Sequence, residues 1–336
     1  MDNNPISCHL LGRLHTVDGK QLQQQYKDHL SAFHTWDQKA HAEEWMLFEA
    51  NIGPSLSIDE TALSNGELYT IITNRAAKGG KKAIVAMLKG TQADQIISVL
   101  ERIPVRKRNQ VKEVTMDMAA NMIKAVRRCF SNATRVIDRF HVQKLAYDAV
   151  QEARIKYRWE ALDAESKAIE EAKQNKQSYQ PEVLNNGDTL KQLLARSRYL
   201  LFKHESKWTA SQKERADLLF PRYPELFKAY NLAIRLGNIF TICKSKQVAF
   251  KGLAIWYNDV EAAGIDAFKT VAKSVQQHYE AILNFFNNRS TNASAESFNA
   301  KIKAFRATSR GVRDNSFFLF RLKNIYALNL SPNFSD

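Results

Sequence analysis

Three carboxylates in this sequence fall at positions where predicted structural elements would hold them in place: Asp59, Asp117 and Glu296. Asp59 lies inside a predicted strand, in alternation with Ser57 and Thr61. A carboxylate in the middle of a strand that is covered on both faces loses solvation energy unless it is paired or binds a metal ion. The alternative is an edge strand whose Asp59 faces water, and Asp59 alone does not decide between the two.

Asp117 directly follows a predicted strand at 111–116 and precedes a predicted helix at 118–130. The carboxyl ends of strands in open sheets with helices packed on them are where ligands collect. An aspartate that caps the N-terminus of the helix would explain the same position equally well.

Glu296 lies on a predicted helix at about 294–307, where it shares one face with Asn299 and Lys303. Another face carries the apolar stripe that would anchor the helix in a core, formed by Phe298, Ile302 and Phe305. Taken alone, Glu296 is better explained as an ordinary surface glutamate. Only its combination with the two aspartates suggests chemistry.

The elements predicted around these residues form a mixed sheet. Residues 56–61, 67–74 and 83–88 are rich in β-formers and are joined by short turns, which predicts an antiparallel meander. Two further strands then alternate with helices, at 111–116 and 134–137. This order predicts an α/β protein of the α+β type, with a mixed sheet and helices packed on it.

Strand patterns stop at about residue 142, and the chain up to 287 has helical periodicity. Residues 20–50 also have the pattern of a helix, and a basic helix is predicted at the C-terminus. We therefore predict four parts: an N-terminal helical segment at 1–54, a first part of the sheet domain at 55–141, a helical insertion at 142–287, and a segment at 288–336 that completes the sheet domain.

The order of the three acids, on a strand, a strand end and a helix, matches the RNase H-like fold. In that fold three carboxylates meet and hold two divalent metal ions about 4 Å apart. Hard oxygen ligands suit Mg²⁺ or Mn²⁺. One ion would activate water or a 3′-hydroxyl, and the other would stabilise the leaving oxygen of a phosphoryl transfer.

Four strings also resemble bacterial insertion-sequence transposases of the "ISL-three" type, over roughly residues 40–325. They are Ser57-Ile58-Asp59-Glu60-Thr61, Val114-Thr115-Met116-Asp117-Met118, Asp138-Arg139-Phe140-His141 and Glu296-Ser297-Phe298-Asn299. The last two strings extend further along the sequence, to Val142 and to Lys303. These two, the Asp-Arg-Phe-His and Glu-x-x-Asn strings, are the specific parts of the resemblance.

The resemblance implies that Asp59, Asp117 and Glu296 are the catalytic DDE triad and the metal ligands. It also implies a helical domain between the second Asp and the Glu. Asp138 and His141 match an Asp-x-x-His signature of related transposases, so they are expected to organise the site together with Asn299. His141 could instead cap the following helix or pack in a core.

Composition is consistent with a DNA-binding protein. The chain has 336 residues, with 49 Lys and Arg against 35 Asp and Glu, a formal net charge of +14. Basic residues cluster at 301–323, where Arg321 and Lys323 add to the five that we predict to contact DNA: Lys301, Lys303, Arg306, Arg310 and Arg313. A solvated basic face is the alternative for this cluster.

The three cysteines are far apart and suggest reduced thiols. The sequence has neither a signal-peptide pattern nor an apolar run of membrane-spanning length, so we expect a cytoplasmic, nucleoid-associated protein without a membrane partner.

Expected partners are transposon ends, target DNA and further copies of the chain. Such transposases usually begin with a cysteine-rich zinc-binding module and a helix-turn-helix. No such cysteine cluster precedes Asp59, so the expectation is that either a separate protein supplies end recognition or this chain has lost it. Two other functions stay open: a catalytically silent DNA-binding protein derived from a transposase, and an RNase H-fold nuclease that cleaves without joining.

Overall fold

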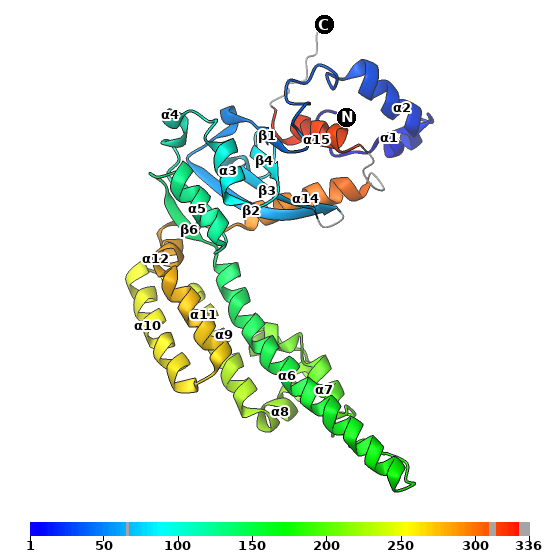
Figure 1. Cartoon of the computed structure of the whole chain (residues 1–336), viewed down its shortest axis with the longest axis vertical. Coiled ribbons are helices and arrows are strands. Elements are labelled where there is room, and N and C mark those ends of the chain that lie inside the picture. The colour runs from blue at the N-terminus through cyan, green and yellow to red at the C-terminus, as the bar shows by residue number, and fades with distance from the viewer. Residues whose placement is uncertain (65–66, 309–313, 329–336) are drawn as a thin grey trace. The chain divides into compact units, whose positions relative to one another are not determined.

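The computed structural model describes residues 1–64, 67–308 and 314–328. The chain divides into two compact units, which are described separately. The first consists of residues 1–138 and 288–336, and the second of residues 139–287. Figure 1 shows the sheet and its helices in the first unit and an all-helical second unit.

The first unit is built on one six-stranded sheet with the order β1-β4-β3-β2-β5-β6. Its middle part is the predicted meander, in which β2, β3 and β4 pair antiparallel. β5 pairs with β2, and β6 with β5, both parallel. The mixed sheet confirms the predicted RNase H-like α+β class. The strand bounds are β1 (Trp45–Leu47), β2 (Ser55–Ser64), β3 (Glu67–Asn74), β4 (Ile84–Lys89), β5 (Glu113–Met116) and β6 (Thr134–Ile137).

Helices cover both faces of this sheet. On one face lie α3 (Ala93–Leu100) and α5 (Ala120–Cys129), with the short α4 (Val105–Arg108) between them in sequence. On the other face, α14 (Ala293–Thr308) and α15 (Asn315–Tyr326) share a core with the strands. That core joins strand and helix residues, among them Ile71, Met87, Phe298, Ile302 and Phe305. The apolar stripe predicted for the Glu296 helix is therefore anchored as expected.

The single helix predicted at 20–50 is wrong. The segment instead forms α2 (Gly19–Gln25), a π-helical turn at Tyr26–Leu30 and the edge strand β1, after a separate α1 (Cys8–Leu14). In β1, Met46 pairs with Met87 of β4. A three-residue strand carries too short a pattern to be recognised locally, and its pairing partner lies about forty residues further along the chain.

The C-terminal helix α15 also differs from the prediction of an exposed basic helix. Arg321 and Lys323 are only 4% and 9% exposed, so their interpretation as DNA contacts is wrong. The Arg321 guanidinium donates to the backbone oxygens of Asn4 (3.3 Å) and Ile6 (3.0 Å). A helix that is apolar on nearly all sides is typically buried, and this one packs under the N-terminal segment.

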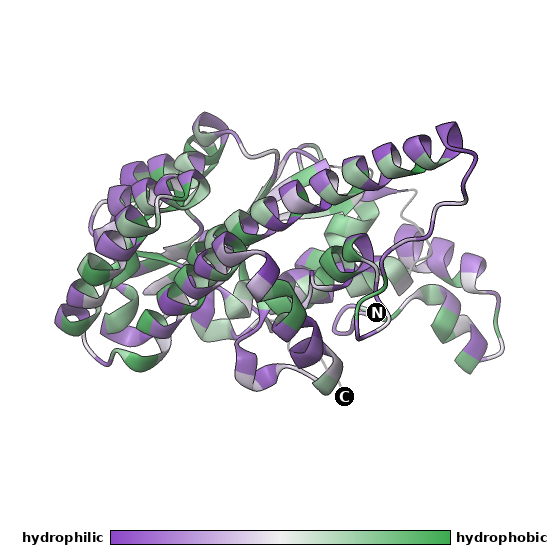
Figure 2. Cartoon of the chain, turned by 90° about the horizontal axis from the view of Figure 1, so that it is seen from below, coloured by the Kyte–Doolittle hydropathy of each residue, from purple (hydrophilic) through white to green (hydrophobic). Residues whose placement is uncertain are grey.

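The second unit is helical, as predicted, and holds no strand among residues 139–287. α8 ends at Arg222, and Pro224 opens α9. Figure 2 shows hydrophobic and hydrophilic residues interleaved along these helices. Their bounds are α6 (Arg139–Gln174), α7 (Leu190–Arg196), α8 (Ala210–Arg222), α9 (Pro224–Ile242), α10 (Lys246–Ala263), α11 (Asp266–Gln277), α12 (Tyr279–Leu283) and α13 (Phe285–Asn288).

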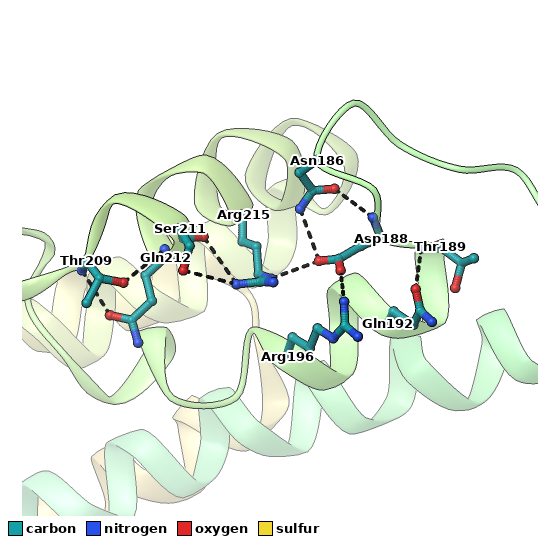
Figure 3. Close-up of polar contacts among 9 residues, drawn as sticks. All are labelled: Asn186, Asp188, Thr189, Gln192, Arg196, Thr209, Ser211, Gln212 and Arg215. Atoms are coloured by element: carbon teal, nitrogen blue, oxygen red, sulfur yellow. Dashed lines mark hydrogen bonds and ion pairs between the residues drawn. The ribbon is translucent and has the colours of Figure 1, made fainter.

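In the second unit, one buried carboxylate is hydrogen-bonded to α7, to α8 and to the loop before α7. Asp188 is 1% exposed and accepts hydrogen bonds from Arg196 of α7, from Arg215 of α8 (2.8 Å) and from Asn186 (3.0 Å), as Figure 3 shows. Because two guanidinium groups from different helices meet one carboxylate, Asp188 joins α7 to α8. No helix in the described part of the chain is long and apolar enough to cross a membrane.

Candidate active site

Three aspartates lie at matching positions just past the residues that pair β2, β5 and β6 in parallel. Ser57 of β2 is paired with Thr115 of β5, and Thr115 with Val136 of β6. The Ser57 and Thr115 hydroxyls are hydrogen-bonded at 2.7 Å, so these side chains share a face. Two residues further along each strand, the same register brings Asp59, Asp117 and Asp138 side by side, with Asp117 in the middle. This edge is where ligands bind in open α/β sheets.

Asp59 is half-buried on the face of the sheet that α14 covers. Its cross-strand partner Ile71 belongs to the core shared with α14. One carboxylate oxygen accepts from the Glu60 backbone N–H at 2.9 Å, and the other accepts from Asn299 Nδ2 of α14 at 2.8 Å. Asp59 therefore does not simply face water from an edge strand, because β2 is a central strand and α14 contacts the carboxylate.

Asp117 is half-buried in the turn between β5 and α5. Its Oδ1 accepts from the Ala119 backbone N–H at 2.8 Å, and Ala119 rather than Asp117 is the N-cap residue of α5. The alternative explanation as a helix N-cap is therefore wrong. The carboxylate instead stabilises the turn that leads into the helix.

Asp138 and Glu296 lie close together at the other side of Asp117. Asp138 is fully buried, Glu296 is exposed, and a carboxylate oxygen of one lies within 4.8 Å of one of the other. Asp138 Oδ2 also accepts from the Asn292 backbone N–H at 3.0 Å. Glu296 and Asn299 are three residues apart on one helix face, so α14 reaches Asp138 through Glu296 and Asp59 through Asn299.

The donor set fits a hard divalent cation. The carboxylates at this edge offer only oxygen, the ligand type of Mg²⁺ and Mn²⁺. Buried side-chain oxygens without a hydrogen bond within the described residues also occur here, on Thr61, Asn292 and Asn299. Such atoms are rare inside proteins unless a further ligand satisfies them. His141 lies on α6 in the second unit, and its role in the site stays a prediction.

Some residues that support the site were not predicted. Glu60 points away from Asp59 and accepts from Asn121 Nδ2 of α5 at 3.1 Å, while the same nitrogen donates to the Thr91 backbone oxygen at 2.6 Å. Asn292 donates from Nδ2 to the Ile58 backbone oxygen at 3.3 Å. The run of polar residues directly before the Glu296 helix, Asn287 to Asn292, is the available signal in the sequence.

The predicted DNA-contacting residues are only partly described. Lys301 and Lys303 are exposed on α14 and Arg306 is half-buried, while Arg310 and Arg313 lie outside the described residues. Lys301 Nζ donates to the Gly79 backbone oxygen at 3.1 Å. Gly79 has a φ of +67°, which side chains rarely adopt, so its carbonyl direction depends on glycine.

Comparison with known proteins identifies the family of the chain. The family model described as "Transposase", for DDE transposases of the ISL-three type, matches residues 56–322. A similar curated protein is the transposase for insertion sequence element IS1001 of Bordetella parapertussis, which is 22% identical over 275 residues. The match covers 82% of this chain and 61% of that protein, so the chain spans about three fifths of the relative's length.

Proposed function

The chain belongs to the DDE transposases of the ISL-three type, and from that premise we propose that Asp59, Asp117 and Glu296 perform metal-dependent cleavage and joining of insertion-sequence DNA. The observation that carries the proposal is that Asp59, Asp117 and Asp138 lie side by side next to one helix, α14. Asp59 and Asp117 are adjacent in the parallel register, and α14 brings Glu296 to the same edge.

Each acid has a defined task in this proposal. Asp59 and Asp117 are metal ligands on rigid strands, and Glu296 is the ligand that α14 supplies. When bound, two Mg²⁺ or Mn²⁺ ions activate the attacking hydroxyl or water and stabilise the leaving oxygen. Asn299 orients the Asp59 carboxylate by donating to its Oδ2. The Glu60 backbone amide donates to the other carboxylate oxygen, Oδ1.

Asp138 and His141 organise the site. The support for Asp138 is its hydrogen bond from the Asn292 amide, which precedes α14 by one residue, and its position near Glu296. Because Asp138 is fully buried, removing the hydrogen-bond donors to its carboxylate would lower the stability of the folded protein. The role of His141 rests on the Asp-x-x-His string alone.

DNA is the proposed partner. Lys301, Lys303 and Arg306 lie on α14, the helix that carries Glu296, and would neutralise phosphates next to the reacting strand. Arg310 and Arg313 follow them in sequence. Assembly of several copies on DNA, a separate end-recognition protein and a place at the nucleoid stay predictions from the family resemblance.

The test is Mg²⁺-dependent joining of pre-cleaved element ends to target DNA. Asp59→Asn, Asp117→Asn and Glu296→Gln should each lower the rate by at least about 100-fold, because metal ions contribute several kcal/mol to transition-state stabilisation. DNA affinity should not fall. The matched control is Asp94→Asn, which removes an exposed carboxylate on α3.

The outcomes separate the alternatives. A wild-type rate in any one of the three variants contradicts the triad. Cleavage without joining by the wild type indicates a nuclease. DNA binding with no reaction in Mg²⁺ or Mn²⁺ indicates a catalytically silent derivative.

A further inference from the structure

A buried carboxylate lies at the start of β5, at the opposite end of the strand from Asp117. Glu113 is 6% exposed and accepts three hydrogen bonds, from Arg75 Nη1 (2.5 Å), Ser290 Oγ (2.5 Å) and Asn288 Nδ2 (3.0 Å). These four residues are called the Glu113 cluster. None of them belongs to the predicted DDE, site-organising or DNA-contacting sets.

The Glu113 carboxylate is an anion at neutral pH despite its burial. Burial alone would raise its pKa, but the hydrogen bonds from Ser290, Asn288 and Arg75 hold the pKa below the ordinary value. A buried anion is stable only while its donors stay in place. The cluster therefore opposes any displacement of Ser290, which is itself 3% exposed.

Two of the three donors belong to the return segment, residues 288–292, which leads directly into α14. Its last residue is fixed to the sheet as well, because Asn292 donates to Asp138 and to the Ile58 backbone oxygen. The first turn of α14 then begins with the Glu296 N–H donating to the Asn292 oxygen at 2.9 Å. The return segment is thus attached to the sheet at both of its ends before the helix starts.

We propose that Glu113 is a positioning residue for Glu296. By holding Asn288 and Ser290 at the start of β5, it fixes where α14 begins relative to the strand that ends in Asp117. Glu113 precedes Asp117 by four positions, about 13 Å along an extended strand, so Glu113 acts through the backbone and not by contact with a metal ion. The catalytic part of this inference rests on the function proposed above.

Amide hydrogen exchange in the full chain tests the positioning without any assay of activity. Glu113→Gln places an NH₂ group among three donors, and Ser290→Ala deletes one donor. Both should speed exchange in the first turn of α14 by about tenfold, while exchange in β3 stays unchanged. Glu101→Gln is the matched control, since it removes an ion pair with Arg128 (2.8 Å) between α3 and α5. It should leave α14 unchanged.

Strand joining tests the consequence for catalysis. Ser290→Ala should lower the rate at saturating DNA by about tenfold and raise the Mg²⁺ concentration for half-maximal rate, with DNA affinity unchanged. Ser290→Thr keeps the hydroxyl and should restore both values. A residue that only stabilises the fold would lower the melting temperature without changing the Mg²⁺ requirement.

The results distinguish this inference from the proposed function. Wild-type exchange in α14 of Ser290→Ala overturns the positioning, and this variant serves even where Glu113→Gln fails to fold. An unchanged Mg²⁺ requirement in Ser290→Ala overturns its catalytic consequence. If Ser290→Ala speeds exchange in α14 but the wild-type protein joins no DNA, the positioning is supported and the proposed function is refuted.

Discussion

At the scale of single residues, the site depends on how each carboxylate is held before any metal ion binds. Asp59 receives one backbone and one side-chain donor, Asp117 receives a turn amide, and Asp138 receives the amide that precedes α14. Each hydrogen bond directs one carboxylate oxygen, and a cation binds the deprotonated form of a carboxyl group. Preorganisation of this kind lowers the cost of binding.

Asn299 offers the clearest single-residue prediction. Asn299→Ala removes the donor to Asp59 Oδ2, so the carboxylate loses its fixed orientation. Loss of a partner that orients a metal ligand typically costs about 10–100-fold in metal affinity or activity. We expect a fall of that size in the joining rate, measured at saturating DNA. Ser297→Ala, an exposed neighbour on the same helix, should keep the wild-type rate, and an unaffected Asn299→Ala would refute the orienting role.

The sequence could nominate Asp59, Asp117 and Glu296 because their order and element types are local information. It could not show that Asp138 and Glu296 come within 4.8 Å of each other, because that depends on the register of β6 against β5 and on where α14 begins. The Glu113 cluster was missed for the same reason. Its members come from positions 75, 113, 288 and 290, which no local pattern connects.

At the scale of elements, hydrophobic periodicity located the strands from β2 to β6 and the helices between them, since each buries its own apolar pattern. It does not predict β1, which has three residues, or the burial of Arg321 and Lys323 in α15. Charge alone does not report burial. The apolar run Phe317-Phe318-Leu319-Phe320 was the stronger signal in α15 and indicated a buried helix.

Arg321 therefore has a structural role, and a stability measurement can show it. Arg321→Ala leaves the oxygens of Asn4 and Ile6 without their donor and removes the guanidinium packed against Phe305. We expect a loss of about 3 kcal/mol in the free energy of unfolding, measured in urea. The exposed Lys303→Ala should change it by less than about 0.5 kcal/mol. Equal effects of the two variants would contradict the buried assignment.

Asp188 gives a pH-dependent prediction for the second unit. Burial would raise its pKa, but Arg215 and Arg196 hold the pKa below the ordinary value. A depressed folded-state pKa contributes stability that is complete above the unfolded pKa of about 4 and is lost as the pH falls through the folded value.

The Asp188→Asn variant should therefore be less stable than the wild type at pH 7, by about 3 kcal/mol. The difference should shrink steadily below about pH 4. Urea unfolding of both proteins between pH 7 and pH 3 measures it. A difference that is independent of pH would show that the charge of Asp188 does not stabilise the unit.

At the scale of the whole molecule, the net charge of +14 and the exposed lysines of α14 predict salt-dependent DNA binding. Lys301→Ala and Lys303→Ala should each reduce the slope of log affinity against log salt concentration by about 1. Lys124→Ala is the matched control on α5, where the lysine is paired with Asp94. An unchanged slope in both α14 variants would exclude these lysines from the DNA interface.

The helical insertion was the part of the molecule most easily predicted, because a long stretch without strand patterns needs no tertiary information. The aspartate edge that it follows was predicted only in outline. Asp138 was expected there only from the Asp-x-x-His string, and its place beside Asp117 required the parallel pairing of β5 and β6.

The most direct test of the central claim is the position of bound metal ions. Anomalous scattering from a crystal of the chain with Mn²⁺ and a cleaved DNA end should place an ion within about 2–2.5 Å of carboxylate oxygens from both Asp59 and Asp117, with Glu296 also a ligand. Ions bound to Asp138 and Glu296 alone, with none at Asp59 and Asp117, would contradict the assignment.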